Sequence, residues 1–349
     1  MKINTTGSLY GNYSHGNQYQ FYFSKNQIDL RKTVVKNDLS KAKFSLNKLK
    51  ISNVMNVGTG RESYALHQLG AKKVYHYDIS KEHVARFKNI LKNKNIDNIE
   101  SKNIDLCLNR IPEELFDFVY LNGIVHHFSD VASGLDNCAK SVNKNGKIWV
   151  YFYRSGTFKW FICQMIRELV SKNELVDFFD QSSILFANGD TNNASTTRIM
   201  DDFFAPFIWL YTPKMYALFM KEYGFVLKEK INSYNFKDVD FNNLHHSSIL
   251  VFERKKILKP NKIPKILRPK NSINQLNPDL YSNKKIKNSI KIFKSLKRNI
   301  LLSKNKTNKF VLLMALHRLA APQYYFEKEL PPRINELEFL LKTMKSILR

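Results

Sequence analysis

The sequence predicts an α/β protein built on a Rossmann-like, doubly wound sheet of seven strands, with a helical insertion and a C-terminal helical extension. Between residues 50 and 255, short apolar and β-branched runs alternate with longer segments of helical period, which is typical of a largely parallel sheet covered by helices. The first run ends in Gly58 and Gly60 and passes directly into a helical segment, and the second ends in Asp78. Both features are typical of nucleotide-binding sheets.

Seven segments have the composition of strands. They are Asn53–Val57, Lys73–Tyr77, Glu100–Ile104, Phe116–Leu121, Lys147–Phe152, Phe225–Ile231 and Ser248–Phe252. The helices between the first strands have their own start or stop signals. Arg61–Leu69 ends at Gly70, which suits a left-handed C-terminal cap, and Ser80 is a suitable N-cap for Lys81–Asn93.

The chain is expected to consist of a central domain with three additions. The central domain covers residues 46–254, and residues 1–45 form a segment that packs near the nucleotide site. Residues 154–224 form a helical insertion between the fifth and sixth strands, and insertions of this size are typical of lids or substrate platforms. Residues 255–349 form a basic linker followed by helices, which we expect over 284–303, 309–321 and 332–348.

Cysteine spacing and hydropathy indicate the compartment. Cys107, Cys138 and Cys163 lie far apart without a C-x-x-C spacing, so we expect neither a disulfide framework nor a metal site. The longest apolar stretches, 203–211 and 310–316, are much shorter than the roughly 20 residues that a membrane span needs. We therefore expect a cytoplasmic protein without a transmembrane segment.

The positive charge lies mainly in the C-terminal part of the chain. The formal net charge is +26, and residues 254–349 contain 24 Lys and Arg residues but 5 Asp and Glu residues. This excess suits an anionic partner such as RNA or an acidic lipid surface. It also follows from the Lys-, Asn- and Ile-rich composition of the whole chain, so both explanations stay open.

The residues around the first two strands predict recognition of a nucleoside. Two glycines after a strand let the backbone approach a ligand closely and direct free N–H groups at it. Asp78 lies 18 residues after Gly60 at the end of the next strand. A carboxylate in that position can accept hydrogen bonds from ribose hydroxyls.

With these residues the chain resembles the class I S-adenosylmethionine-dependent methyltransferases. After the glycine loop, the resemblance continues in order through Gly70–Ser80, Asn103–Leu106, Phe116–Phe128 and Val142–Ile148. It implies S-adenosyl-L-methionine as cofactor, with Asp78 at the ribose and Asp105 at the adenine amino group. The implied cofactor-binding residues are Asn56, Gly58, Thr59, Gly60, Asp78, Ile79, Asp105, Leu106, Asn122 and Gly123.

The glycine loop departs from the family pattern. If Gly60 is aligned with the last glycine of the family loop, the usual acid falls on Val54 and the first glycine on Asn56. In the alternative alignment the loop is shorter, and Asn56 lies near the place of the acid as a hydrogen-bonding substitute. Both alignments change how the amino-acid end of the cofactor is held.

Three side chains are candidate catalytic bases. His126 and His127 follow the fourth strand, where the resemblance places the transferred methyl group, and imidazole suits proton transfer near neutral pH. Packing or capping is the alternative role for both histidines. Asp202, in the insertion, is the third candidate. No metal is required for in-line methyl transfer from a sulfonium.

The acceptor is predicted to be a small molecule. The segment Asp201–Phe207, followed by Tyr211–Pro213, is similar to the acceptor side of family members that modify small molecules. Its aromatic density suits an apolar or ring-bearing acceptor, although the same aromatics equally suit packing on the sheet. We therefore predict methyl transfer to a small molecule such as a glycan or a lipid-linked or isoprenoid precursor.

Two other functions stay open. The first is an RNA methyltransferase that uses the basic tail, but the sequence contains no recognisable RNA-binding module and no aromatics interleaved with the tail lysines, so nucleic acid is not favoured. The second is a catalytically silent protein that serves as a binding or scaffold module. The sequence does not predict an oligomeric state.

Overall fold

The computed structural model describes residues 23–170, 174–178, 180–181, 199, 201–231, 247–267, 284–302, 306–320 and 334–347. Residues 1–22 of the N-terminal segment therefore lie outside the described residues. So does the polar centre of the predicted insertion, residues 188–197. The chain divides into two compact units. The first contains residues 1–152, 206–234 and 247–268, and the second contains residues 153–205, 235–246 and 269–349.

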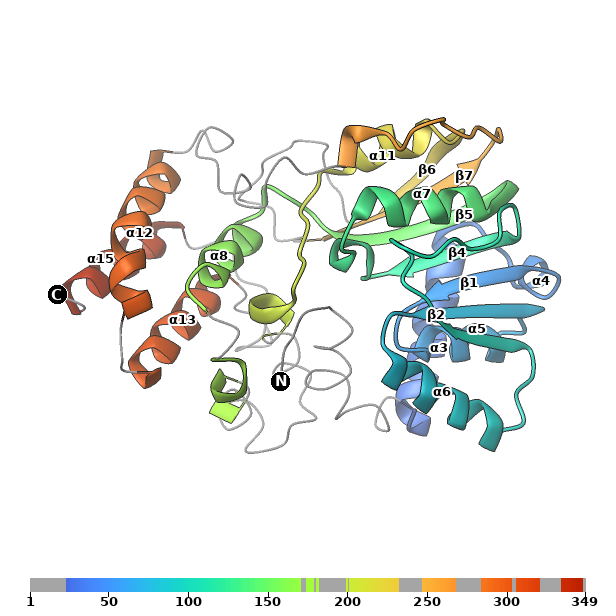
Figure 1. The fold of residues 1–349 in the computed structure, drawn as a ribbon, viewed down its shortest axis with the longest axis horizontal. Coiled ribbons are helices and arrows are strands. Elements are labelled where there is room, and N and C mark those ends of the chain that lie inside the picture. The colour runs from blue at the N-terminus through green and yellow to red at the C-terminus, as the bar shows by residue number, and fades with distance from the viewer. Residues whose placement is uncertain are drawn as a thin grey trace. The chain divides into compact units, whose positions relative to one another are not determined.

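The first unit contains one sheet of seven strands in the order β3-β2-β1-β4-β5-β7-β6 (Figure 1). The strands are β1 (Asn53–Val57), β2 (Lys73–Asp78), β3 (Ile99–Asn103), β4 (Phe116–Asn122), β5 (Val142–Tyr153), β6 (Phe225–Ile231) and β7 (Ser247–Arg254). The strands β1 to β5 pair in parallel, whereas β6 and β7 are antiparallel. The predicted α/β fold with seven strands is confirmed.

Helices cover both faces of this sheet. They are α3 (Lys25–Lys41), α5 (Arg61–Gln68) and α6 (Lys81–Asn93) on one face and α7 (Val131–Ser141) and α11 (Pro213–Lys221) on the other. Successive residues of β4 alternate between the two cores. Phe118 and Tyr120 pack under α3 and α5, whereas Val119 and Leu121 pack under α7 and α11.

The strand order changes direction between β1 and β4, because the chain continues from β1 toward β3 and then returns to the other side of β1. In sheets of this kind ligands bind at the carboxyl ends of the strands beside that reversal. The residues that follow β1, β2 and β4 are therefore the candidates for a ligand-binding site.

The second unit is helical in its described part. Its longer helices are α8 (Phe158–Arg167), α12 (Lys284–Leu302), α13 (Lys306–Ala320) and α15 (Ile334–Ile347). The helix α13 packs against α8 and α15, and α12 packs against α15. None of the helices in the described part of the chain is long and apolar enough to cross a lipid bilayer.

Two features of the first unit differ from the sequence-based expectation. The helix α7 is not predicted, because Gly134 lowers its helix propensity; the glycine is needed since a side chain there would meet the ring of Phe128. The strand β5 begins at Val142 rather than Lys147, because Val142 already pairs with Phe116. The strand contains one residue with left-handed backbone, Asn145, with a φ of 62°.

Candidate cofactor and active site

The loop between β1 and α5 is shaped by two glycines. Gly58 has a φ of 132° and Gly60 a φ of 95°. Positive φ angles of this size favour glycine over other residues. A Cβ atom at Gly60 would lie 2.8 Å from the ring of Phe87, whereas a Cβ atom at Gly58 would meet nothing within 4 Å. Gly60 therefore serves packing, and Gly58 leaves open space beside the backbone, as close approach of a ligand requires.

Asp78 lies directly beside this loop. The backbone N–H of Gly58 donates to the carbonyl of Tyr77 at 3.0 Å, which joins the loop to the end of β2. The Asp78 carboxylate accepts the backbone N–H of Ser80 at 2.7 Å, and its second oxygen lies 3.3 Å from Nδ1 of His83. These contacts fix its orientation and leave lone pairs for further donors such as ribose hydroxyls.

The end of β3 brings the predicted adenine-side residues to the same edge. Asn103 lies opposite Asp78, and its side-chain amide donates to the carbonyls of Asp78 and Ile79 at 2.9 Å each. The Ile79 side chain is 37% exposed and offers apolar surface beside the carboxylate. Asp105 is half-buried and accepts the backbone N–H of Cys107 at 2.8 Å, and Leu106 packs into the core.

On the other side of β1, β4 ends in Asn122 and Gly123. Both residues are half-buried, and Asn122 lies opposite Tyr151 of β5. Gly123 has a φ of 75° and turns the chain toward the two histidines. The strand ends of β1, β2, β3 and β4 thus collect most of the predicted cofactor-binding residues at one edge of the sheet.

Two of the predicted loop residues have polar contacts of their own. Asn56 is fully buried; it accepts the Ser63 hydroxyl at 2.7 Å and donates to the carbonyl of Tyr120 at 3.1 Å. Its amide therefore connects β1, α5 and β4 inside the protein, and a contact with the cofactor stays a prediction. The Thr59 hydroxyl accepts a hydrogen bond from Arg61 at 3.2 Å, so it lies on the half-buried side of the loop.

His76 supports the glycine loop from inside the sheet and was not predicted. Its Nε2 lies 2.6 Å from the carbonyl oxygen of Gly58, and its Nδ1 lies 2.8 Å from the Ser101 hydroxyl. Because a carbonyl oxygen only accepts, Nε2 carries the hydrogen, and Nδ1 of the neutral ring accepts from Ser101. Burial lowers the pKa of His76, which keeps the ring neutral.

His126 and His127 lie in the short helix η2 (Val125–His127), just after β4. Nδ1 of His127 lies 2.9 Å from the carbonyl oxygen of Phe207. Because that oxygen only accepts, Nδ1 carries the hydrogen, and Nε2 is the basic nitrogen of the neutral ring. His126 is fully buried, and the two ring centroids lie 4.1 Å apart.

An aromatic segment around Trp209 is hydrogen-bonded to the turn that contains these two histidines. The backbone N–H of Trp209 donates to the carbonyl of His126 at 2.9 Å, and its indole N–H donates to the carbonyl of Phe128 at 2.8 Å. The rings of Phe207 and Trp209 stack with centroids 6.1 Å apart, and both side chains are half-buried. The structure therefore places two partly accessible aromatic rings beside the candidate base.

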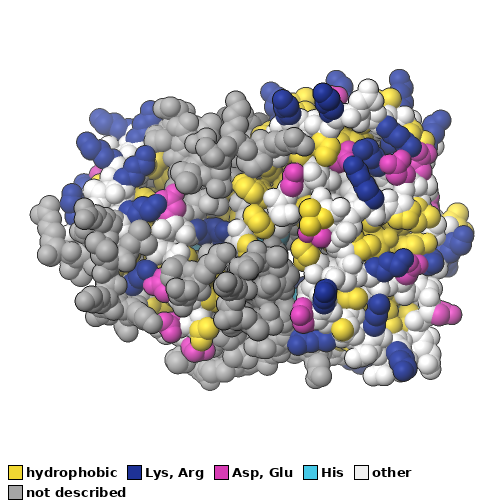
Figure 2. Space-filling model, viewed as in Figure 1, with side chains coloured by type: hydrophobic (Ala, Val, Ile, Leu, Met, Phe, Trp, Pro, Cys, Tyr) yellow, Lys and Arg dark blue, Asp and Glu magenta, His cyan; other side chains and the backbone are white. Residues whose placement is uncertain are grey.

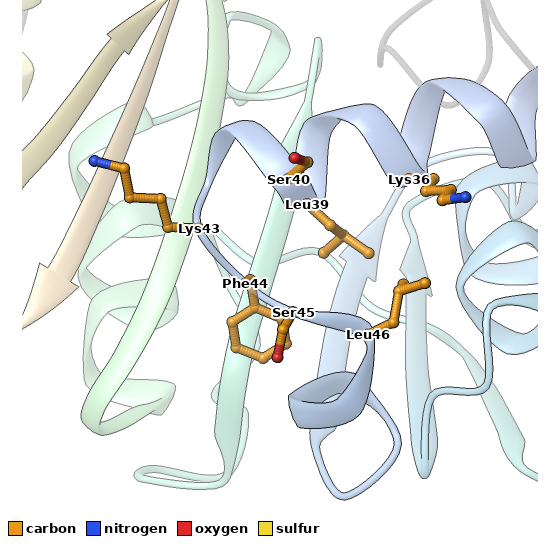
Figure 3. Close-up of a pocket in the computed structure, with 7 residues that line it drawn as sticks. All are labelled: Lys36, Leu39, Ser40, Lys43, Phe44, Ser45 and Leu46. Atoms are coloured by element: carbon orange, nitrogen blue, oxygen red, sulfur yellow. The ribbon is translucent and has the colours of Figure 1, made fainter.

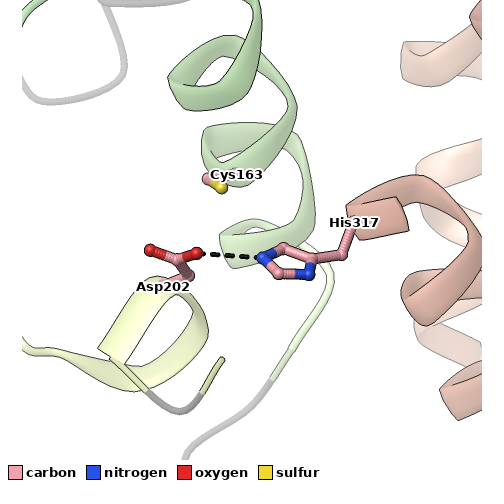
Figure 4. Close-up of side chains that lie close together, drawn as sticks. All are labelled: Cys163, Asp202 and His317. Carbon is pink, nitrogen blue, oxygen red and sulfur yellow. Dashed lines mark hydrogen bonds and ion pairs between the residues drawn. The ribbon is translucent and has the colours of Figure 1, made fainter. Parts of the chain in front are cut away.

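The third predicted base, Asp202, belongs to the second unit (Figure 4). One of its carboxylate oxygens lies 2.9 Å from Nε2 of His317 and 3.1 Å from the ammonium of Lys159. Burial alone would raise the pKa of Asp202, but the charge of Lys159 and the hydrogen bond with His317 hold it below its usual value. These contacts favour a structural role of Asp202 over a catalytic one. Its carboxylate pairs with Lys159 of α8 and contacts His317 of α13, and so connects the two helices.

Cys163 completes a group that has the ligand types of a metal site. Ligand atoms of Cys163, Asp202 and His317 lie within 4.8 Å of one another, and all three residues are buried (Figure 4). The ammonium of Lys159 already neutralises the carboxylate, and burial raises the pKa of the Cys163 thiol. The charges of the group are therefore balanced by protein atoms alone.

A surface hollow lies away from the candidate site (Figure 3). It is lined by Lys36, Leu39, Ser40, Lys43, Phe44, Ser45 and Leu46. The ring of Phe44 packs on Phe118 of β4, and Lys147 of β5 donates to the backbone carbonyl of Lys43 at 2.9 Å. These contacts place the hollow beside the amino-terminal halves of the parallel strands, whereas the glycine loop lies at their carboxyl ends.

Residues 55–150 match a family model described as a methyltransferase domain. The match covers about a quarter of the chain and extends from β1 into β5, so it includes Gly58, Asp78, Asp105 and His127. A comparison with curated proteins found no match.

Several solved structures are similar in fold. The protein PH0226 from Pyrococcus horikoshii OT3 is 16% identical, with a TM-score of 0.44 over 71% of this chain and 99% of that chain. An S-adenosylmethionine-dependent methyltransferase from Mesorhizobium loti is 12% identical, with a TM-score of 0.40 over 61% and 98%. For the [4+2]-cyclase SpnF the identity is 13% and the TM-score 0.28, and the match spans 30% of this chain and 42% of that chain.

Proposed function

The chain carries a class I S-adenosylmethionine-dependent methyltransferase domain, and we propose that this domain transfers the methyl group to a small-molecule acceptor. One observation carries the proposal. The segment that contains Phe207 and Trp209 is hydrogen-bonded to the turn that contains His126 and His127. A pair of stacked, partly accessible rings beside a basic nitrogen suits an acceptor with an apolar or ring-bearing body and a hydroxyl to be methylated.

The residues at the strand ends fit the cofactor. Gly58 provides the space for close approach, Asp78 provides a fixed carboxylate for the ribose hydroxyls, and Ile79 provides apolar surface for the adenine. Asp105 is assigned to the adenine amino group. When bound, the sulfonium supplies an electrophilic methyl group, and the protein must align the acceptor behind that carbon and exclude water.

We assign His127 as the base that removes the acceptor's proton. The carbonyl of Phe207 fixes the tautomer whose Nε2 accepts a proton, and the orientation of the ring follows from that hydrogen bond and from its burial. His126 is assigned a positioning role through its backbone carbonyl, which holds Trp209. Asp202 ranks behind both, because its carboxylate is buried against Lys159.

The acceptor can be identified by mass spectrometry. The full-length protein is incubated with methyl-labelled S-adenosylmethionine and separate metabolite, lipid and RNA fractions. We expect a labelled small molecule or lipid that is heavier by one methylene group. Label found in RNA alone would replace the proposal with an RNA methyltransferase. Cofactor binding without any labelled product in any fraction would favour a binding or scaffold protein.

Replacing His127 tests its assignment as the base. With a hydroxyl acceptor, His127→Ala should lower kcat by about 10²–10⁴-fold, because general base catalysis contributes that much. Cofactor affinity, measured by calorimetry, should change little, since His127 is assigned to the acceptor and not to the cofactor. An unchanged kcat with the identified acceptor would show that His127 is structural.

Replacing Asp78 tests the cofactor site separately. Asp78→Asn keeps the shape of the side chain but removes its charge, so affinity for S-adenosylmethionine should fall by about 10- to 100-fold, as expected for a hydrogen bond to a charged group. The matched control is Asp97→Asn, which changes an exposed acid before the start of β3. Equal affinities of the two variants would contradict the assignment.

A further inference from the structure

One helix of the second unit presents a row of lysines to solvent. Lys284, Lys287, Lys291 and Lys294 of α12 are all exposed. At 3.6 residues per turn they fall within an arc of about 80°, and at 1.5 Å per residue they extend over about 15 Å. The four lysines, which we call the α12 lysine row, thus form a straight line of positive charge on one face.

The opposite face of α12 is buried. Ile290, Phe293, Leu296 and Ile300 are at most 4% exposed, and α12 packs against α15. The apolar side chains of α12 therefore pack inside the second unit. The lysines of the row remain at the surface.

The α12 lysine row has no ion pair with any carboxylate among the described residues. Within the part of the chain that the structure describes, none of the four lysines lies within ion-pair distance of a carboxylate, whereas Lys297 on the same helix lies 2.6 Å from Glu168. Figure 2 shows Lys and Arg side chains gathered at the corner of the view where Figure 1 places α12. Such a surface attracts an extended anionic partner.

We propose that the α12 lysine row binds an anionic lipid surface. A flat membrane of acidic headgroups matches a straight row of charges on the outer face of a helix, and binding of this kind is additive over the lysines. The buried apolar face fits electrostatic attachment without insertion of the helix. The described exposed residues of α12 include no aromatic residue for base stacking, which disfavours RNA.

The size of the effect follows from the number of lysines. Each lysine near an anionic membrane changes the partition coefficient by about fivefold. Removing all four charges should therefore lower binding by at least tenfold, and by on the order of 100-fold or more if all four contact the surface together. Raising the salt concentration should weaken binding, because the Debye length falls to about 3 Å at 1 M.

The test is co-sedimentation of the full-length protein with vesicles, without methyl donor or acceptor, so that its outcome is independent of the proposed enzymatic function. Vesicles of phosphatidylcholine alone are compared with vesicles that contain phosphatidylglycerol, at low and high salt. The variant changes all four lysines of the row to Gln. The matched control changes Lys36, Lys88, Lys92 and Lys221, four exposed lysines of the first unit, to Gln.

We expect salt-sensitive binding of the unchanged protein to the anionic vesicles alone, loss of binding in the α12 variant, and retention in the control. Because all eight lysines are exposed, both variants should keep the circular dichroism spectrum and unfolding midpoint of the unchanged protein. The proposal is overturned if the unchanged protein does not bind anionic vesicles or if both variants lose binding equally. It is also overturned if single-stranded RNA displaces the vesicles at equal phosphate concentration and loses its own binding in the α12 variant.

Discussion

At the scale of single residues, His76 shows how a buried side chain can set the shape of a ligand loop. Its ring connects the Gly58 carbonyl to Ser101 on β3, so the loop is held by two neighbouring strands. Without this ring the part-buried carbonyl oxygen of Gly58 would lose that partner, and the loss of a buried hydrogen-bond partner costs up to about 1–3 kcal/mol. We therefore predict that His76 is a positioning residue, which acts on the bound cofactor through Gly58.

Replacing His76 with Phe should keep the ring volume and remove both hydrogen bonds. We expect a loss of about 1–3 kcal/mol in the free energy of unfolding and a severalfold weaker affinity for S-adenosylmethionine, with kcat at saturation unchanged. His67→Phe is the matched control, because it removes a hydrogen bond to Asn98 far from the loop. If both variants bind the cofactor equally well, His76 serves packing alone.

Single residues of the site were predicted unevenly. The proximity of Gly58 and Asp78 could be predicted because both follow the ends of neighbouring parallel strands, and the register of β1 and β2 brings them together; their contacts with the cofactor stay predictions. His76 could not, because a histidine inside an apolar strand does not reveal which carbonyl it meets. Asn56 was predicted as a ligand from alignment alone, whereas its amide is used between β1 and β4.

At the scale of elements, the buried pair of Asp202 and Lys159 stabilises the junction of α8 and α13. The ammonium of Lys159 also lies 4.6 Å from the ring centroid of Trp160. His317 supplies the contact from α13. A carboxylate that balances a buried ammonium is costly to remove, because the ammonium then loses this counter-ion while it stays buried.

Asp202→Asn should lower the free energy of unfolding of the full-length protein by about 3–5 kcal/mol, as measured by urea denaturation. Asp201→Asn is the matched control: its carboxylate accepts a hydrogen bond from Tyr153 at 3.2 Å, and its loss should cost about 1 kcal/mol. A catalytic role would instead appear as a large fall in kcat with unchanged stability. That result would return Asp202 to the active site.

Elements with a clear periodicity were predicted well. Both β1 and β6 have the predicted bounds, and α12 ends one residue before the predicted end. The helix α7 was missed because its sequence contains a glycine that packing against Phe128 requires. Local helix propensity does not predict such a contact, because Gly134 and Phe128 approach each other only once the turn between them has folded.

At the scale of the whole molecule, the described part of each unit contains a buried histidine whose pKa is lowered by burial, His76 in the first and His317 in the second. In the unfolded chain both take up a proton near pH 6.5. The folded state resists that protonation, so the stabilising contribution is complete above about pH 6.5 and is lost as the pH falls toward the lower folded pKa.

Urea denaturation at pH 7.5 and at pH 5.5 should therefore give a lower free energy of unfolding at the acidic pH. The loss is at most about 1.4 kcal/mol per histidine for each pH unit below 6.5. His76→Phe should reduce this pH dependence, since a phenyl ring does not titrate. A free energy of unfolding that is equal at both pH values would show that neither histidine keeps a lowered pKa.

The strand order also has a consequence for biosynthesis. The last strand of the described residues, β7, lies between β5 and β6, so β6 has no place in the sheet until residue 254 has left the ribosome. Until then the nascent sheet ends at β5 with unpaired backbone groups, which is a template for pairing with other chains. The antiparallel β6–β7 hairpin must then add as a unit and close that edge. Translation of this short stretch is therefore the interval in which the edge of the nascent sheet is open to pairing with other chains.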